Sequence, residues 1–160
     1  YGQSMYQAAT IMEANIVYGS PGRRLPINTY NDKASAVTEA DYRAQAEGQP
    51  IALSYESDKA LQNINRSNAI GGYETSSKTQ LHEYPMASTQ QGGNGAMVTA
   101  IENSLHNSHG GQLSAFYASN NLMQGDYFIH YTGFNRWTNT LASIPQFAQS
   151  TVLNIINQYR

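Results

Sequence analysis

The sequence contains no cysteine, few charged residues and no long apolar segment. The absence of cysteine excludes disulfide bonds and thiolate metal sites. Charged residues make up 12% of the chain, whereas about 25% is usual in soluble domains. No apolar run approaches the roughly 20 residues of a membrane-spanning helix, and no basic segment followed by an apolar one opens the chain. We therefore expect no contact with a membrane.

Because charged residues are few, we expect Asn, Gln, Ser, Thr and the 12 tyrosines to make most of the polar contacts. The net charge of -2 and the pI of about 6.1 argue against a pure nucleic-acid-binding module, which is usually basic. They argue less against a nuclease, because a bound divalent cation brings positive charge to the phosphate. A length of 160 residues with 40% hydrophobic residues suits one core. We therefore expect a single domain over residues 1–160.

Hydrophobic periodicity and the placement of Gly, Pro and capping residues predict alternating helices and short strands. This order predicts an α+β fold in which a small antiparallel sheet packs with helices. Leu113, Phe116 and Tyr117 form an apolar stripe that indicates core packing. The predicted helices cover residues 2–15, 39–47, 58–69, 112–121 and 143–159, the predicted strands 16–18, 51–55, 81–84, 96–101 and 126–131, and residues 102–111 are a predicted polar turn.

An adjacent His82-Glu83 pair closes one of the predicted strands, just before Pro85. The pair combines a base that titrates near neutral pH with a hard oxygen donor. A strand and a polar turn later, Asn107 stands at the mouth of a predicted helix. The order strand, strand, helix, with a histidine on the first strand and an amide at the helix, is typical of a one-metal nuclease. In such a site the imidazole takes a proton from water while the metal stabilises the phosphate.

Two short motifs carry a family resemblance. The run HEYPMA at residues 82–87, followed by GGNGA at 92–96, resembles the D-E-W-P-M-A and E-G-G-x-G-A signature of the NucA/NucB deoxyribonuclease family. Residues 16–18, 54–66 and 107–111 resemble further segments of that family in the same order. The resemblance covers about residues 16–131. Residues 1–15 and 132–160 are then extra helical segments without a counterpart.

The resemblance implies a divalent-metal-dependent, largely sequence-independent DNA endonuclease with an active site of the ββα-metal type. His82 stands where bacterial members carry Asp, and the wider ββα-metal nucleases use His as the general base. Glu83, Arg66 and Asn107 match the family's Glu, Arg and Asn, whereas Ser108 replaces the Arg that follows the Asn. We therefore predict His82, Glu83 and Arg66 as the catalytic residues.

The same resemblance leads to predictions for ligands and substrate contacts. One Mg²⁺ or Mn²⁺ ion is predicted to be held by Asn107 with help from Glu83 or Gln112. Arg66 is predicted to hold the scissile phosphate by a bidentate contact, and His109 to contact the substrate. DNA is the expected substrate, with RNA left open.

Each of these residues also has a structural interpretation. His82 would be a hydrogen-bonded core histidine, Glu83 a carboxylate that orients another group, and Arg66 a surface helix residue. Asn107, Gln112, His106 and His109 would be turn or first-turn residues, with a metal chelate open for the two histidines. The alternative function is a non-catalytic glycan- or protein-binding module that uses the Tyr, Asn, Gln and Trp137 side chains.

The biological setting follows only as an expectation. The chain begins at Tyr1, which we interpret as a processed or excised start. The absence of cysteine suits a toxin domain delivered into a cytosol, and a secreted scavenging nuclease is the other alternative. We expect a secreted or delivered monomer, with an inhibitor or immunity protein as a further partner.

Overall fold

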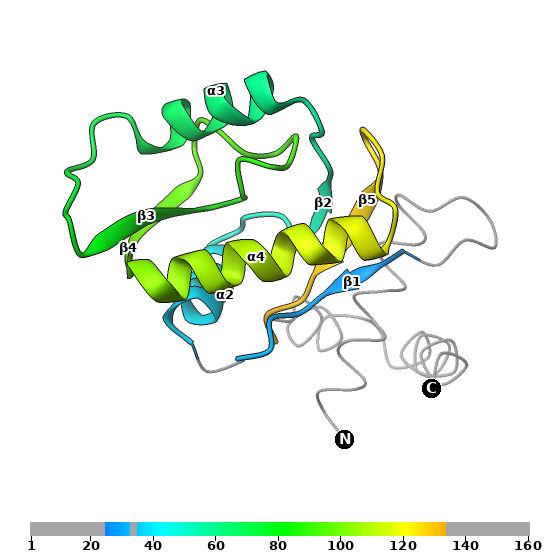
Figure 1. The fold of residues 1–160 in the computed structure, drawn as a ribbon, viewed down its shortest axis with the longest axis horizontal. Coiled ribbons are helices and arrows are strands. Elements are labelled where there is room, and N and C mark those ends of the chain that lie inside the picture. The colour runs from blue at the N-terminus through cyan, green and yellow to red at the C-terminus, as the bar shows by residue number, and fades with distance from the viewer. Residues whose placement is uncertain (1–24, 33–34, 134–160) are drawn as a thin grey trace, which may run out of the picture. The chain divides into compact units, whose positions relative to one another are not determined.

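A computed structural model of the chain describes residues 25–32 and 35–133 (Figure 1). The helices and strands predicted for residues 2–18 and 143–159, together with Trp137, lie outside these described residues. Within the described residues the helices are α2 (Ala36–Ala46), α3 (Lys59–Ile70) and α4 (Asn103–Ser119). The strands are β1 (Ile27–Asn28), β2 (Ala52–Ser54), β3 (Thr79–Tyr84), β4 (Met97–Glu102) and β5 (Tyr127–His130).

The strands form two small sheets. In the first, β5 lies between β1 and β2, parallel to β1 and antiparallel to β2. The second is an antiparallel hairpin in which β3 pairs with β4, with His82 opposite Thr99 and Glu83 opposite Val98. With three helices in the described residues, this confirms the predicted α+β class. None of the helices in that part of the chain is long and apolar enough to cross a membrane.

Local signals fix the ends of α2 and α3. The Ser35 side chain accepts a hydrogen bond from the Thr38 amide at the start of α2, and Asp58 accepts from the Ala60 and Leu61 amides at the start of α3. Both are residue types that satisfy the unpaired first amides of a helix. Gly48, with a φ of 106°, follows α2 and provides the left-handed backbone that ends a helix.

The polar turn predicted for residues 102–111 is wrong, because most of this segment is the first half of α4. The Glu102 side chain caps the helix by accepting from the Ser104 and Leu105 amides. His109 and Leu113, four residues apart, are both buried on one face. Packing of that face stabilises the helix despite the weak helix propensity of its Asn, Ser and Gly residues.

The main core lies where α4 meets β2, β5 and the end of β3. It includes Leu53, Tyr84, Leu113, Tyr117 and Phe128, all buried. Phe116 packs against this cluster, so the predicted stripe of α4 is confirmed as core.

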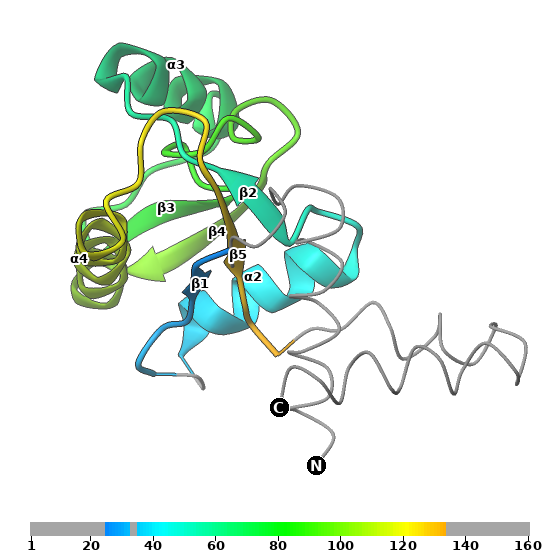
Figure 2. The same cartoon turned by 90° about the vertical axis from the view of Figure 1, so that its right-hand side faces the viewer.

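The β3–β4 hairpin lies between α3 on one side and α2 with α4 on the other (Figures 1 and 2). Successive side chains of a strand point to opposite faces. Accordingly Glu83 contacts Arg66 of α3, whereas His82 contacts Asp41 of α2 and Gln80 contacts Asn107 of α4. Side chains of nearby β3 residues thus contact three different helices.

Candidate active site

A pocket of about 560 Å³ opens between α3 and α4, beside β3. β3 and the loop after it line it with His82, Glu83, Met86, Ala87 and Ser88, and α3 lines it with Lys59, Gln62 and Arg66. The remaining lining is His106, His109, Gly110, Leu113, Ser114, Tyr117 and Ala118 of α4, together with Tyr30, Tyr55, Asn121 and Leu122. The pocket therefore brings together four of the predicted site residues, which are Arg66, His82, Glu83 and His109.

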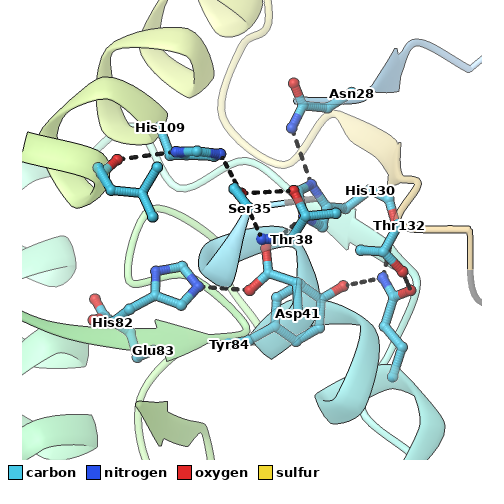
Figure 3. A network of polar contacts seen from close by, with 12 residues as sticks. Asn28, Ser35, Thr38, Asp41, His82, Glu83, Tyr84, His109, His130 and Thr132 are labelled. Atoms are coloured by element: carbon cyan, nitrogen blue, oxygen red, sulfur yellow. Dashed lines mark hydrogen bonds and ion pairs between the residues drawn. The ribbon is translucent and has the colours of Figure 1, made fainter. Parts of the chain in front are cut away.

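His82 is held from behind by a buried carboxylate. Its Nε2 donates a hydrogen bond of 2.5 Å to Oδ1 of Asp41, which is fully buried on α2 (Figure 3). Among the described residues no hydrogen bond uses the other ring nitrogen, Nδ1, and His82 lines the pocket. With Nε2 carrying the proton, Nδ1 of the neutral ring has a free lone pair. This Asp–His pair has the arrangement in which an acid fixes the tautomer and orientation of a catalytic imidazole.

The second oxygen of Asp41 is also satisfied. His130 donates from Nε2 to Oδ2 at 2.8 Å, and Asn28 donates from Nδ2 to the His130 Nδ1 at 3.0 Å (Figure 3). A buried carboxylate is costly unless it is paired and hydrogen-bonded, and these two imidazole donors meet that need. His130 thus supports the carboxylate that holds His82.

The Asp41–His82 pair shifts both titrations. Burial alone would raise the pKa of Asp41, but the charge of His82 and the hydrogen bonds from both histidines outweigh it and lower the pKa below its ordinary value. Burial alone would lower the pKa of His82, but the charge and hydrogen bond of Asp41, with the charge of Glu83, raise it above its ordinary value. Each partner therefore favours the charged form of the other.

Glu83, the residue after His82 on β3, forms an ion pair with Arg66 of α3. The Arg66 guanidinium donates from Nη1 to Glu83 Oε2 at 2.5 Å and from Nη2 to the Leu81 carbonyl at 3.0 Å. Glu83 is buried, whereas the Arg66 side chain is 35% exposed. The planar fork of Arg66 is thus anchored on one edge of β3 while part of it faces solvent at the pocket.

His106 lines the pocket, although it is not one of the predicted catalytic, metal-binding or substrate-binding residues; the sequence left a metal chelate open for it. Its ring meets the His82 ring edge-on, with centroids 5.9 Å apart. Its Nδ1 is buried and has no hydrogen-bond partner in the described part of the chain. Burial, and then the charges of His82 and Arg66, lower its pKa below the ordinary value. A side-chain hydrogen bond with Asn107 opposes this lowering of the pKa but does not outweigh it. Burial and the nearby charges therefore favour the neutral ring, whose Nδ1 has no hydrogen-bond partner among the described residues.

Two predicted metal ligands lie outside the pocket lining. The Asn107 carbonyl oxygen accepts from Gln80 Nε2 at 3.0 Å, and the Gln112 carbonyl oxygen accepts from the Asn31 amide at 2.8 Å. Their role as ligands stays a prediction. His109 lines the pocket, but its Nε2 contacts Ser35 Oγ at 2.9 Å and its Nδ1 the Leu105 carbonyl at 2.9 Å. Both nitrogens of this predicted substrate-binding residue therefore act within the fold.

The family assignment agrees with this geometry. β3, β4 and α4 follow one another as strand, strand and helix, with His82 on the first strand beside the pocket. The sequence model of the family described as Deoxyribonuclease NucA/NucB matches residues 22–130. The chain belongs to the NucA/NucB deoxyribonuclease family. Comparison with curated protein sequences finds no match.

NucA/NucB membership fixes the fold type as that of a ββα-metal nuclease, with β3, β4 and α4 as its ββα unit. Asp41 is the main site residue that was not predicted from the sequence. Asp41 lies on the face of α2 that also buries Val37, Ala44 and Gln45. An acidic residue at helical spacing among buried positions was the one available signal. A fully buried acid with a shifted pKa, such as Asp41, is a feature that often marks a functional site.

Proposed function

We propose that this NucA/NucB family member is a divalent-metal-dependent DNA endonuclease in which His82 is the general base. The observation that carries the proposal is the hydrogen bond from His82 Nε2 to the buried Asp41, which leaves Nδ1 as the unbonded nitrogen at the pocket. Water gives its proton to Nδ1 while its oxygen bonds to phosphorus, and the bond from phosphorus to the 3′ oxygen breaks. Asp41 stabilises the imidazolium that forms.

Arg66 is proposed to hold the scissile phosphate. Its guanidinium is fixed by Glu83 and the Leu81 carbonyl, and its exposed part faces the pocket. A phosphate placed there meets a delocalised charge of fixed orientation, which suits an oxyanion. Because such contacts touch phosphate rather than base edges, cutting is expected to be largely independent of sequence.

The donors at the pocket fit a hard divalent cation such as Mg²⁺ or Mn²⁺. Glu83 supplies a carboxylate, and His106 supplies the buried Nδ1 that has no protein partner among the described residues. The described residues contain no cluster of three or more His, Asp or Glu side chains that could hold a metal. One carboxylate completed by water and substrate phosphate is nevertheless usual for Mg²⁺. His106 would add an imidazole, a donor that is more typical of Zn, Cu, Fe and Ni sites. When bound, the cation would stabilise the charge that develops on the phosphate and the leaving oxygen.

A supercoiled-plasmid assay tests the proposal. The wild-type protein is expected to nick plasmid with Mg²⁺ or Mn²⁺ and to stop in excess EDTA. The His82→Ala variant is expected to lose about 10²- to 10⁴-fold in rate, with an unchanged circular dichroism spectrum. Full activity of that variant would remove His82 from the base role, and full activity in EDTA would remove the metal. Secretion, or delivery as a toxin with a cognate inhibitor, remains the proposed setting.

A further inference from the structure

The pocket extends well beyond His82, Glu83 and Arg66. Its lining residues on α4 recur every three or four positions from His106 to Ala118. At a rise of about 1.5 Å per residue, these 12 steps run about 18 Å along the helix. On α3, Lys59, Gln62 and Arg66 line the other wall at the same spacing. The pocket is therefore a short groove between two helices.

The two ends of this groove differ in chemistry. α3 and α4 run in opposite directions, as Figure 1 shows. Arg66 bonds the Leu81 carbonyl of β3, and its charge acts on His106. At the other end of α3, the Ser57 amide donates to the Gln124 side chain just beyond the end of α4. The groove thus begins at the catalytic group and ends where α3 starts, beside Lys59.

The far end is aromatic and apolar. Tyr55 and Tyr117 meet there with ring centroids 4.4 Å apart and planes tilted by 36°, and Leu122 adds an apolar side chain. Tyr55 is only partly buried, and no hydrogen bond among the described residues uses its hydroxyl. Tyr117 is buried in the core and its hydroxyl bonds Ser88, so it supports the Tyr55 ring from below. The partly exposed Tyr55 ring is the surface on which a nucleobase of any identity can stack.

A positive charge stands beside this aromatic end. Lys59 Nζ donates to Gln62 Oε1 at 3.0 Å, and no carboxylate of the described residues forms an ion pair with it. Its charge is therefore available to a phosphate, as in grooves that follow a single strand.

The size of the groove suits one nucleotide. Its volume of about 560 Å³ is that of a site for one small molecule, about 300–1,000 Å³. One unstacked nucleotide is a ligand of that size class, and the length of about 18 Å leaves room for the adjoining backbone of its strand.

We propose that the end of the groove formed by Tyr55, Tyr117 and Lys59 binds an unstacked nucleobase and its phosphate, so that the enzyme engages single-stranded or locally unpaired DNA. This inference rests on the proposed nuclease function, because it places the strand that is cut. It makes Tyr55 and Lys59 substrate-positioning residues. It also predicts that nicking of duplex DNA occurs where a base can leave the stack.

Fluorescence anisotropy of the full chain in excess EDTA tests the site, with strand integrity followed on a gel. The probes are a short labelled DNA strand, its duplex, and a strand of the same length built wholly from abasic sugar-phosphate. The single strand is expected to bind more tightly than both. Equal binding of the single strand and the abasic strand by the wild-type protein would overturn the proposal without any variant.

Variants then locate the platform. Tyr55→Ala is expected to weaken single-strand binding about 5- to 150-fold, the range for loss of one base–aromatic stack. Tyr55→Phe keeps the ring and should bind as the wild type does. Tyr73→Ala, which removes an exposed tyrosine outside the pocket, is the matched control and should also be neutral. An equal loss for the abasic strand would assign the effect to the fold rather than to stacking, and would overturn the proposal.

The gel separates this inference from the function on which it rests. Cleavage of the strand in EDTA, or no cleavage with Mg²⁺ or Mn²⁺, contradicts the proposed metal-dependent nuclease. The anisotropy result is independent of cleavage, and alone decides the base-binding site.

Discussion

His82 and Asp41 are 41 residues apart in the sequence, yet Nε2 of the imidazole donates to the buried carboxylate at 2.5 Å. The carboxylate comes from the buried face of α2 and the imidazole from β3. The link fixes which nitrogen of His82 carries the proton, and so which nitrogen can accept one at the pocket.

Asp41→Asn is expected to lower the nicking rate by about 10²- to 10⁴-fold while plasmid binding is retained. An amide in place of the carboxylate no longer selects the Nε2–H tautomer or stabilises the imidazolium. Single-turnover nicking and plasmid binding are measured separately. A loss that appears only in binding would contradict the positioning role.

The same substitution tests the stability that Asp41 contributes. The pKa of Asp41 is lowered in the folded protein, because its two histidine partners outweigh burial. The unfolded chain therefore binds this proton more readily, and the stabilisation is present above about pH 4 and lost as the pH falls through the lowered pKa. Asp41→Asn should be less stable than the wild type near neutral pH. Urea unfolding in EDTA should show this gap shrinking below about pH 4, and a gap independent of pH would rule out the linkage.

Arg66→Lys is expected to reduce nicking by about 10-fold or more. Lysine keeps the charge, but it loses the planar fork that contacts Glu83 and the Leu81 carbonyl at once. Arg43→Lys is the matched control, because Arg43 forms an exposed helix ion pair with Glu39. Nicking rates are compared at several salt concentrations. Equal effects of the two substitutions would show that Arg66 acts only as a surface charge.

Glu83→Gln and His106→Ala are each expected to raise the Mn²⁺ concentration for half-maximal nicking by about 10-fold or more, as for perturbed metal sites. Asn107→Ala should raise it less, because the Asn107 carbonyl is bonded to Gln80 outside the pocket lining. Titration of Mn²⁺ for the three variants gives the comparison. A large shift for Asn107→Ala with none for His106→Ala would restore the ligand set predicted from the sequence.

The sequence predicted most of the described elements well. Strand positions such as 51–55 and 81–84 and the helix after Asp58 were found because their signals are local: alternation, a cap and a stop. The segment 102–111 failed because its polar composition indicates a turn, whereas burial of His109 and Leu113 stabilises a helix. Composition alone does not show which residues the tertiary structure will bury.

By itself, the sequence determined the family, the α+β class and the His82-Glu83 pair at the end of a strand, because motifs and periodicity are properties of neighbouring residues. Only the tertiary structure brought Asp41 to His82 and Arg66 to Glu83, since these contacts join separate elements. It also selected His106 rather than Asn107 as a lining residue of the pocket. Consecutive residues of a helix point about 100° apart, and the packing of α4 decides which of the two faces the site.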